Sequence, residues 1–238
     1  MNALRKNWER LRNRLRGDRL PVLPPQEGYD RWAASYGEDM NPVQVLEAEA
    51  LARLLPDLRD RVVLDLGCGK GRVARLALER GASETVGVDI SEAMLKAASA
   101  ALPAPTARWV RAEGQALPFD AASFDVVVCA LMMGHVEDLE TALSEIARVL
   151  RPGGVLLLSD FHPYATLRGW QRAFTDVESG RVFAIENYPH LFDAYLRCFN
   201  KLNLVLETLE EPCYEGYPVV FIMRARKEGV KRETSGRP

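Results

Sequence analysis

The sequence predicts an α/β protein built on one doubly wound sheet of seven strands, mostly parallel, with helices on both faces. Three observations predict it. Short apolar strands alternate with amphipathic helical segments along most of the 238 residues. A loop with glycine at every second position follows the first of these strands. The last two strands are joined by a turn too short for a crossover helix, so we expect them to be antiparallel neighbours.

The first half of the chain supplies the opening elements in turn. Asn41-Pro42 and the apolar residues spaced behind them predict a helix that leads into the first strand. Ser91 is a suitable N-cap for a later helix, which Pro103 would end. We expect strands at 61–66, 85–89, 107–112 and 124–130, with helices at 71–80 and 92–102.

The second half continues the alternation and then reverses direction. We expect a helix at 139–150, a strand at 154–160, a helix at 190–202 and strands at 204–210 and 218–226. The turn Pro-Cys-Tyr-Glu-Gly-Tyr-Pro joins the last two strands, which makes the C-terminal strand antiparallel. In such sheets ligands bind outside the carboxyl ends of the parallel strands.

Composition predicts a compact enzyme without a membrane span. Hydrophobic residues make up 47% of the chain, and no apolar run approaches the length of a transmembrane helix. The net charge of −2 gives the protein no general attraction for nucleic acid. Its four cysteines lack C-x-x-C spacing, which argues against a metal site and fits a reducing cytoplasm.

The first 20 residues differ from the rest of the chain in charge. They carry seven basic and two acidic residues, and Leu4, Trp8, Leu11 and Leu15 share one helical face. A basic amphipathic helix of this kind can contact an anionic membrane surface or an acidic partner. The alternative is a solvated helix that caps the domain through its apolar stripe. Both interpretations remain open.

The loop after the first strand has the features of a nucleotide-binding turn. Glycines at 67, 69 and 71 let the backbone bend tightly and let a ligand approach the main chain. The helix behind them presents free N–H groups to an anionic group. Asp89, at the tip of the next strand, suits the two hydroxyls of a ribose. The ligand is therefore expected to be an adenosine derivative. A dinucleotide fingerprint would need glycine at Arg72, which disfavours a nicotinamide cofactor.

Five segments in order resemble the motifs of the class I S-adenosylmethionine-dependent methyltransferases. They are Asp65–Gly71, Val86–Ser91, Ala112–Phe119, Phe124–Val128 and Leu150–Gly154. The resemblance implies a Rossmann-like sheet and S-adenosylmethionine as cofactor. It also implies cofactor contacts at Tyr29, Asp65, Gly67, Cys68, Gly69, Gly71, Asp89, Ile90, Glu113, Gly114, Ala130 and Leu131.

Individual roles follow from the resemblance residue by residue. Asp65 would orient the methionine amino group, or would instead cap the next helix. Asp89 would hold the ribose, and Ile90 would pack on the adenine. Glu113 stands where the family usually has an aspartate near the adenine amino group. Ala130 and Leu131 would flank the methionine moiety.

A segment ahead of the first motif resembles one branch of the family. Tyr29-Asp30-Arg31-Trp32-Ala33-Ala34-Ser35-Tyr36 is similar to the lead-in of quinone C-methyltransferases and malonyl carrier-protein O-methyltransferases. The resemblance implies that this helix folds over the cofactor, with the Tyr29 hydroxyl on the cofactor carboxylate. Tyr29 and Tyr36, seven residues apart, would share a helical face. The alternative is that both rings are buried packing.

Methyl transfer from a sulfonium needs mainly orientation, and a base only where the acceptor arrives protonated. Three histidines lie where a base could serve: His135, His162 and His190. Each is a candidate catalytic base, and the alternative for each is a hydrogen-bonding role in the fold. No metal is expected.

The predicted function is methyl transfer to oxygen or carbon of a small, partly apolar metabolite. One alternative is a malonyl carrier-protein O-methyltransferase, and another is a cofactor-binding assembly or regulatory factor without catalysis. The segment after strand 154–160 is rich in aromatic residues, which favours an apolar substrate or plain lid packing. The predicted division is a basic extension over 1–28, a methyltransferase domain over 29–228 with a substrate-side lid at 161–190, and a disordered tail over 229–238.

Overall fold

The computed structural model describes residues 20–38, 41–103, 105 and 107–229. The predicted basic helix over 1–20 and the predicted tail over 229–238 lie outside these ranges, apart from Leu20 and Gly229. Both remain predictions. No helix within the described ranges has the length and apolar character needed to cross a bilayer.

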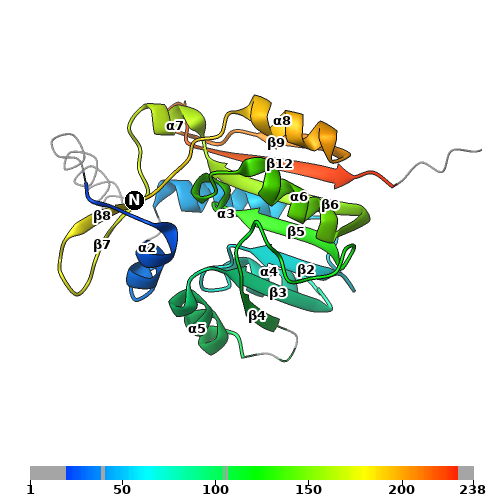
Figure 1. Cartoon of the computed structure of the whole chain (residues 1–238), viewed down its shortest axis with the longest axis horizontal. Helices are drawn as coiled ribbons and strands as arrows, with labels where there is room; N and C mark the ends of the chain where they lie inside the picture. The colour runs from blue at the N-terminus through cyan, green and yellow to red at the C-terminus, as the bar shows by residue number, and fades with distance from the viewer. Residues whose placement is uncertain (1–19, 39–40, 104, 106, 230–238) are drawn as a thin grey trace, which may run out of the picture.

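A seven-stranded sheet forms the centre of the molecule (Figure 1). Its strands are β2 Val62–Leu66, β3 Glu84–Asp89, β4 Ala107–Arg111, β5 Phe124–Ala130, β6 Leu150–Phe161, β9 Leu204–Glu210 and β12 Val220–Lys227. They lie in the order β4-β3-β2-β5-β6-β12-β9. β12 is antiparallel to both of its neighbours, and the pairs on the other side of β6 are parallel. The predicted fold class is confirmed.

Five helices correspond to the predicted ones. They are α3 Pro42–Leu54, α4 Arg72–Glu79, α5 Glu92–Ala101, α6 Leu139–Val149 and α8 Phe192–Lys201. Ser91 caps α5 as expected, because its hydroxyl accepts a hydrogen bond from the Met94 N–H at 3.1 Å. Asn41 and Gln44 form a reciprocal capping box at the start of α3, where Pro42 occupies the first helical position.

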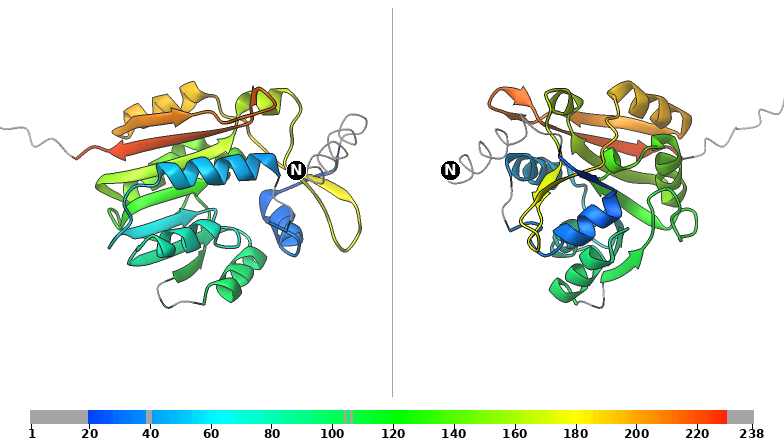
Figure 2. Two further views of the ribbon diagram at one scale, coloured as in Figure 1. Left: turned by 180° about the vertical axis from the view of Figure 1, so that it is seen from behind. Right: turned by 60° about the vertical axis from the view of Figure 1, so that its left-hand side comes forward.

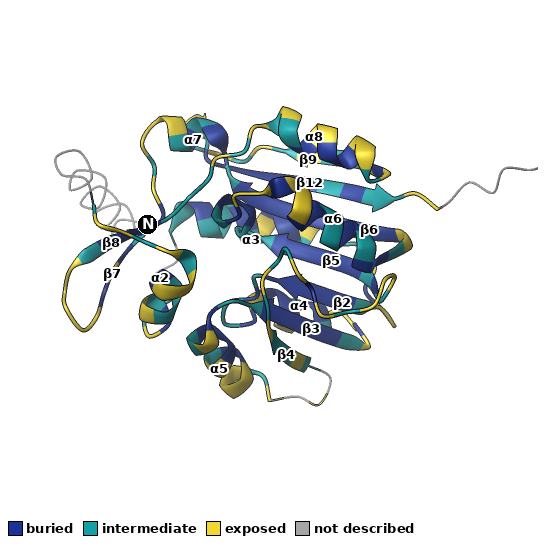
Figure 3. Ribbon diagram, in the orientation of Figure 1, coloured by how far each residue is buried: buried dark blue, intermediate teal, exposed yellow. Residues whose placement is uncertain are grey.

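Side chains from alternate positions of each strand enter two separate hydrophobic cores. Val63 and Val126 pack with α3 and α4 on one face, whereas Leu64 and Val127 pack with α6 and α8 on the other. The left view of Figure 2 shows the molecule from behind. There α3 crosses the face of the sheet that points away from the viewer in Figure 1. The central strands are buried along almost their whole length (Figure 3). Covering both faces leaves the strand ends as the place for a site.

A second, smaller sheet lies beside the carboxyl ends of the central strands, and the sequence did not predict it. It consists of β1 Val22–Leu23, β8 Val182–Ile185 and β7 Ala173–Thr175, in that order. Helix α2, Pro25–Trp32, packs on it (Figure 1). Phe174, Phe183 and Ile185 form a small core there with Trp32 beside them.

Four short elements complete the described chain: η1 Met133–His135, α7 Pro163–Leu167, and the strands β10 Cys213–Tyr214 and β11 Tyr217–Pro218, which form a hairpin. The hairpin falls in the turn predicted between the last two strands.

Two boundaries differ from the prediction by more than two residues. The strand expected from 154 begins at Leu150, because Leu150 pairs with Phe124 before an irregularity in the β5–β6 register. Helix α2 ends at Trp32, so Tyr36 lies in the turns that follow and not on the same helix as Tyr29. The two rings still meet edge to edge, with 6.1 Å between their centroids.

Candidate cofactor-binding site

A cavity of about 370 Å³ opens at the carboxyl ends of β2, β3 and β5, and α2 closes one side of it. This volume lies within the usual range of small-ligand sites, about 300–1,000 Å³. Its lining consists of Pro24, Pro25, Gln26, Tyr29, Tyr36, Leu66, Gly67, Gly69, Val88, Asp89, Ile90, Ala112, Glu113, Gly114, Gln115, Ala130, Leu131, Met132, His135 and Val136.

Most of the predicted cofactor residues lie at this cavity. Those that line it are Tyr29, Gly67, Gly69, Asp89, Ile90, Glu113, Gly114, Ala130 and Leu131. Asp65, Cys68 and Gly71 are not among the lining residues. The chain therefore brings the four loops after β2, β3, β4 and β5 to one place with α2.

Glycine is required by the loop after β2. Gly67 has φ +72°, and a Cβ there would lie 2.6 Å from Met132 Cγ. A side chain at Gly67 would therefore strain the backbone and displace Met132 from the cavity wall. The absence of a side chain at Gly67 gives Met132 the room to pack against the loop.

The Asp89 carboxylate is held by the backbone on both of its oxygens. Oδ2 accepts from the Gly69 N–H at 2.8 Å, and Oδ1 accepts from the Ser91 N–H at 2.9 Å. A carboxylate has about four acceptor sites, so each oxygen can still accept from a ligand. Burial raises the pKa of Asp89, and the backbone hydrogen bonds oppose that shift.

Asp65 is almost fully buried beneath the loop, with 1% of its surface exposed. Its Oδ2 accepts from the Ala74 N–H, in the first turn of α4, at 3.0 Å. This is the contact of the helix-capping alternative. Burial is the main cause that raises the pKa of Asp65 to about 7.

Cys68 and Gly71 face the protein interior behind the loop. Cys68 is buried, and its Sγ would lie 3.0 Å from a Cβ on Gly87. A Cβ on Gly71 would lie 2.6 Å from Cη2 of Trp109. Trp109 also lies against Gly87, so its ring supports the loop from below. The sequence analysis did not single out this tryptophan.

Tyr29 and His135 are joined across the cavity wall. The Tyr29 hydroxyl lies 2.8 Å from His135 Nε2, and His135 Nδ1 lies 2.7 Å from the carbonyl oxygen of Glu186. Burial and the Arg172 charge lower the pKa of His135 well below its usual range. Burial raises the pKa of Tyr29. Both groups are therefore neutral near pH 7.

The other two histidines lie away from the cavity lining and have partners in the fold. His162 Nε2 lies 2.8 Å from Glu211 Oε1, and its Nδ1 accepts from the Tyr164 N–H at the start of α7. His190 Nε2 donates to the carbonyl oxygen of Val136 at 2.7 Å. These contacts correspond to the hydrogen-bonding alternative for both residues.

Helix α2 is fastened to the central domain by a residue that the sequence analysis did not assign. Asp30 Oδ1 accepts from the Ser91 hydroxyl at 2.6 Å and from the Ala93 N–H at 3.2 Å. Asp30 therefore shares with Ser91 the capping of α5. Tyr29 and Asp30, adjacent on α2, thus connect the helix to η1 and to the start of α5.

A buried ion pair lies behind η1 and was also missed. The Asp160 carboxylate, at the end of β6, pairs with Arg172 and accepts from the Gly134 N–H. Both side chains are 4% exposed. The Arg172 guanidinium also lies over the Phe161 ring and donates to Asn187 Oδ1 at 3.2 Å. An acid closing a strand was the available signal for Asp160.

Backbone strain marks the end of β5. Leu131 has φ +57°, a left-handed conformation that is uncommon for leucine. Its N–H donates to the Ser159 carbonyl oxygen at 2.9 Å, which holds the turn. With this left-handed conformation at Leu131, the side chains of Leu131 and Met132 lie on the cavity wall.

The six aromatic residues of the segment 161–190 do not line the cavity: Phe161, Tyr164, Trp170, Phe174, Phe183 and Tyr188. Phe174 stacks on Trp32 at 5.3 Å and Phe183 lies beside it, so these two rings bind α2 to the small sheet. The segment reaches His135 through the backbone carbonyl of Glu186. The contacts of Phe174 and Phe183 correspond to the packing alternative.

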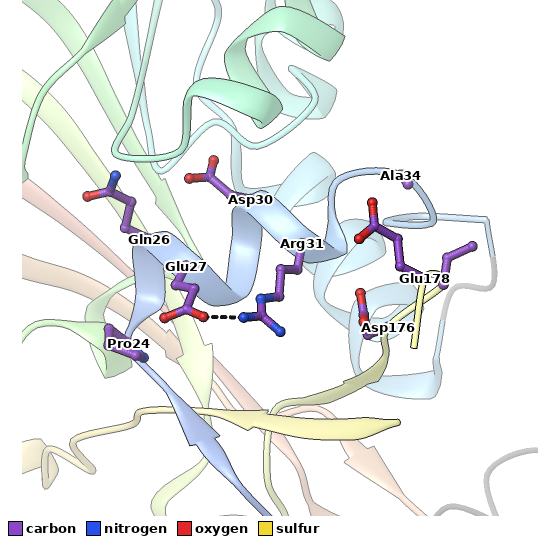
Figure 4. Close-up of a pocket in the computed structure, with 9 residues that line it drawn as sticks. Pro24, Gln26, Glu27, Asp30, Arg31, Ala34, Asp176 and Glu178 are labelled. Carbon is purple, nitrogen blue, oxygen red and sulfur yellow. Dashed lines mark hydrogen bonds and ion pairs between the residues drawn. The ribbon is translucent and has the colours of Figure 1, made fainter. Parts of the chain in front are cut away.

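A larger hollow of about 620 Å³ lies on the other side of α2 (Figure 4). It is lined by Glu27 and Arg31, which pair with each other, and by Asp176, Val177 and Glu178 of the β7–β8 turn. Figure 4 shows Asp30 pointing away from that pair. None of the motif loops reaches this hollow, so we assign the site to the smaller cavity.

Comparisons with known proteins agree with the geometry. A family model described as "Methyltransferase domain" matches residues 64–158. A crystal structure of an S-adenosylmethionine-dependent methyltransferase from Mesorhizobium loti superimposes with a TM-score of 0.66 at 26% identity. The match covers 76% of this chain and 97% of that one.

Two curated relatives share the same region. Malonyl-[acyl-carrier protein] O-methyltransferase of Salmonella typhimurium is 41% identical over 124 residues, 52% of this chain and 48% of that protein. The 2-phytyl-1,4-naphtoquinone methyltransferase of Nostoc punctiforme is 36% identical over 140 residues, 56% of this chain and 60% of that protein.

Residues 64–158 carry the methyltransferase domain of the class I S-adenosylmethionine-dependent family. S-adenosylmethionine is the cofactor of this methyltransferase domain. The matches span about half the length of the curated relatives, so the identity concerns the domain and not their whole activity.

The residues of the cavity fit that cofactor chemically. The Asp89 carboxylate keeps free acceptor sites for a diol, and Gly67 and Gly69 bring the main chain of their loop to the cavity wall. Ile90 and Val136 are apolar residues of the cavity wall, against which the adenine ring can pack. The cofactor supplies a methyl group on a positively charged sulfur.

Proposed function

We propose that this methyltransferase domain transfers a methyl group from S-adenosylmethionine to oxygen or carbon of a small, partly apolar molecule. The observation that carries the proposal is the cavity at the carboxyl ends of β2, β3 and β5, which joins the family's motif loops to α2. In this proposal Asp89 binds the ribose, Ile90 packs on the adenine, and Glu113 and Gln115 lie near its amino group.

The end of the cavity formed by α2 supports an acceptor with apolar character. Pro24 and Pro25 line it, together with the polar groups of Gln26 and Tyr29. Apolar walls with a few polar groups are typical of small-molecule sites, where the polar groups fix orientation. The acceptor is proposed to bind there, within contact of the cofactor.

His135 is poorly suited to remove a proton from the acceptor. Its Nε2 lies at hydrogen-bond distance from Tyr29, and protonation would place a second positive charge near the buried Arg172 guanidinium. We therefore propose an acceptor that arrives ionised or that carries an easily ionised hydroxyl or acidic carbon, so that orientation supplies most of the rate.

The malonyl carrier-protein alternative has support from the relatives but less from the cavity. The 124 shared residues amount to about half of this chain, and its family motifs specify the cofactor rather than the acceptor. Among the described lining residues there is no Lys or Arg to bind a malonyl carboxylate, and Arg172 is already paired with Asp160. We rank this acceptor second.

Methyl release from labelled S-adenosylmethionine over a panel of acceptors tests the proposal. The panel contains hydroxylated aromatic and quinol compounds, short carboxylic acids and a malonyl thioester. We expect turnover with one member of the first class. Turnover confined to the malonyl thioester would establish the second candidate. Cofactor binding without turnover on any acceptor would favour the assembly or regulatory factor.

Asp89→Asn and Asp193→Asn make a matched pair for this assay. Asp193 lies on the exposed side of α8, far from the motif loops in sequence, and its pairing with Arg197 is on the surface. We expect Asp89→Asn to lower turnover at limiting cofactor and Asp193→Asn to leave it unchanged.

The cysteines support the proposal of a reducing, cytoplasmic location. Cys68, Cys129 and Cys198 are buried free thiols, and Cys213 is an exposed one. The comparisons give no support to membrane or acidic-partner contact through residues 1–20.

A further inference from the structure

We propose that the oxygen of the Tyr29 hydroxyl contacts the positively charged sulfonium group of the methyl donor as a hydrogen-bond acceptor. His135 is the residue that positions this hydroxyl. This inference rests on the proposed function and goes beyond it. The predicted contact of Tyr29 with the cofactor carboxylate would need the hydroxyl to donate. The hydrogen bonds around His135 point to the opposite polarity.

The tautomer of His135 follows from its partners. The carbonyl oxygen of Glu186 can only accept, so His135 Nδ1, 2.7 Å away, must carry a proton. A neutral imidazole then has no proton on Nε2. Nε2 lies 2.8 Å from the Tyr29 hydroxyl and therefore accepts from it. The Tyr29 proton is committed to His135.

The Tyr29 oxygen consequently offers lone pairs to the cavity that it lines. A hydroxyl whose only proton is donated elsewhere can accept from a ligand but cannot donate to it. Such an oxygen favours a positively polarised group over a carboxylate.

His135 itself is fixed from several directions. The Gly134 N–H donates to Asp160, and the Gly134 carbonyl accepts from the Tyr188 N–H at 2.6 Å. A Cβ on Gly134 would lie 2.6 Å from Asn187 Oδ1, so the turn is tightly enclosed. The imidazole is therefore held in the orientation that receives the Tyr29 proton.

The charges of the cavity wall act in the same direction. Two carboxylates, Asp89 and Glu113, line the cavity, and its described lining contains no Lys or Arg. A wall of this composition favours a cation over a neutral ligand of the same shape. The sulfur of S-adenosylmethionine is positively charged, whereas the sulfur of the product S-adenosylhomocysteine is neutral.

Calorimetric titration of the full chain with three ligands tests the proposal. S-adenosylmethionine carries the sulfonium, sinefungin carries a protonatable amine in its place, and S-adenosylhomocysteine carries a neutral sulfur. We expect Tyr29→Phe to weaken binding of the two cationic ligands about tenfold, as for loss of a hydrogen bond to a charged group. Binding of S-adenosylhomocysteine should change less than about twofold.

Two further variants separate this role from packing. His135→Leu frees the Tyr29 proton, and we expect it to reduce the preference for cationic ligands while the Tyr29 ring stays in place. Tyr217→Phe, on an exposed tyrosine of β11, should change none of the three affinities. Thermal unfolding of each variant checks that it is folded.

Nitrogen NMR of the ligand-free chain tests the tautomer independently. We expect His135 to show the Nδ1–H form, which is the minor one in free histidine. The Nε2–H form would overturn the proposal, as would a Tyr29→Phe effect that is equal for all three ligands or absent. Failure of the wild-type chain to bind any of the three would instead overturn the proposed function.

Discussion

The carboxylate of Asp30 accepts a hydrogen bond from the Ser91 hydroxyl, with 2.6 Å between the two oxygens. This contact ties α2 to the first turn of α5, two residues beyond Asp89. It explains how a helix outside the central sheet is held over the cavity. The position of α2 then depends on Asp30 on one side and Tyr29 on the other.

Replacing Asp30 by alanine should loosen α2 without unfolding the sheet. The loss of a capping carboxylate costs about 1 kcal/mol, and Ser91 still accepts from the Met94 N–H. We expect faster hydrogen exchange at residues 25–32 and weaker cofactor binding. Glu27→Ala removes an exposed charge from the same helix and serves as the control. Equal exchange in the two variants would show that the Asp30 contact does not hold the helix.

Breaking the Asp160–Arg172 pair should be among the most costly substitutions outside the cores. Removing one partner of a buried pair leaves an uncompensated charge, at a cost of about 3–5 kcal/mol. We expect Asp160→Asn to lower the free energy of unfolding in urea by that amount. Glu210→Gln breaks an exposed pair with Arg53 and should cost about 0–1 kcal/mol. Similar losses for the two variants would argue against a strongly coupled buried pair.

Asp65 should make stability fall as the pH rises. Its pKa is about 7 in the folded chain and about 3.9 in an unfolded one. Above about pH 4 the carboxyl ionises in the unfolded chain but stays protonated in the folded one, which favours unfolding. The penalty grows between about pH 4 and pH 7 and then levels off, at on the order of 4 kcal/mol. Asp65→Asn keeps an oxygen for the Ala74 N–H and removes the titration.

The measurement is the unfolding free energy of the wild-type chain minus that of Asp65→Asn at each pH, so that other groups cancel. We expect this difference to decrease from pH 4 to pH 7. A constant difference would mean that the folded-state pKa of Asp65 is not raised. Asp193→Asn, at an exposed carboxylate, is the surface control for this measurement.

Gly67→Ala should lower the free energy of unfolding by more than the strain of the backbone angle alone. The new Cβ would meet Met132 Cγ at 2.6 Å, in addition to the strain of φ +72°. Gly216 has φ +83° and nothing within 4 Å, so Gly216→Ala measures the angle cost by itself. We expect Gly67→Ala to lose about 1–3 kcal/mol more and to weaken cofactor binding. Equal losses would indicate that Met132 moves freely aside.

The central sheet could be predicted because each strand carries its own signal. Val62–Leu66 is a short apolar run before a glycine loop, and Val220–Lys227 follows a turn that can only reverse the chain. The small sheet could not be predicted, since β1 has two residues and β7 has three. Neither is long enough to display a period, and both depend on packing against α2.

The residues of the site could likewise be predicted only in part. Gly67, Gly69 and Asp89 belong to one local strand–loop–strand unit, so their spacing alone indicates a common cavity. Tyr29 and His135 are 106 residues apart, and no local pattern indicates that they meet. The fastening role of Asp30 depends likewise on an α2 position that tertiary contacts determine.

Equilibrium binding of S-adenosylmethionine to the wild-type chain and to Asp89→Ala is the most direct test of the account. Asp89 would supply the ribose acceptors and also accepts from the Gly69 N–H, so its loss removes ligand contacts and loosens the loop. We predict one binding site on the wild-type chain and at least about a tenfold weaker one on the variant. Unchanged affinity in Asp89→Ala, or no binding by the wild-type chain, would contradict the assignment of this cavity to the methyl donor.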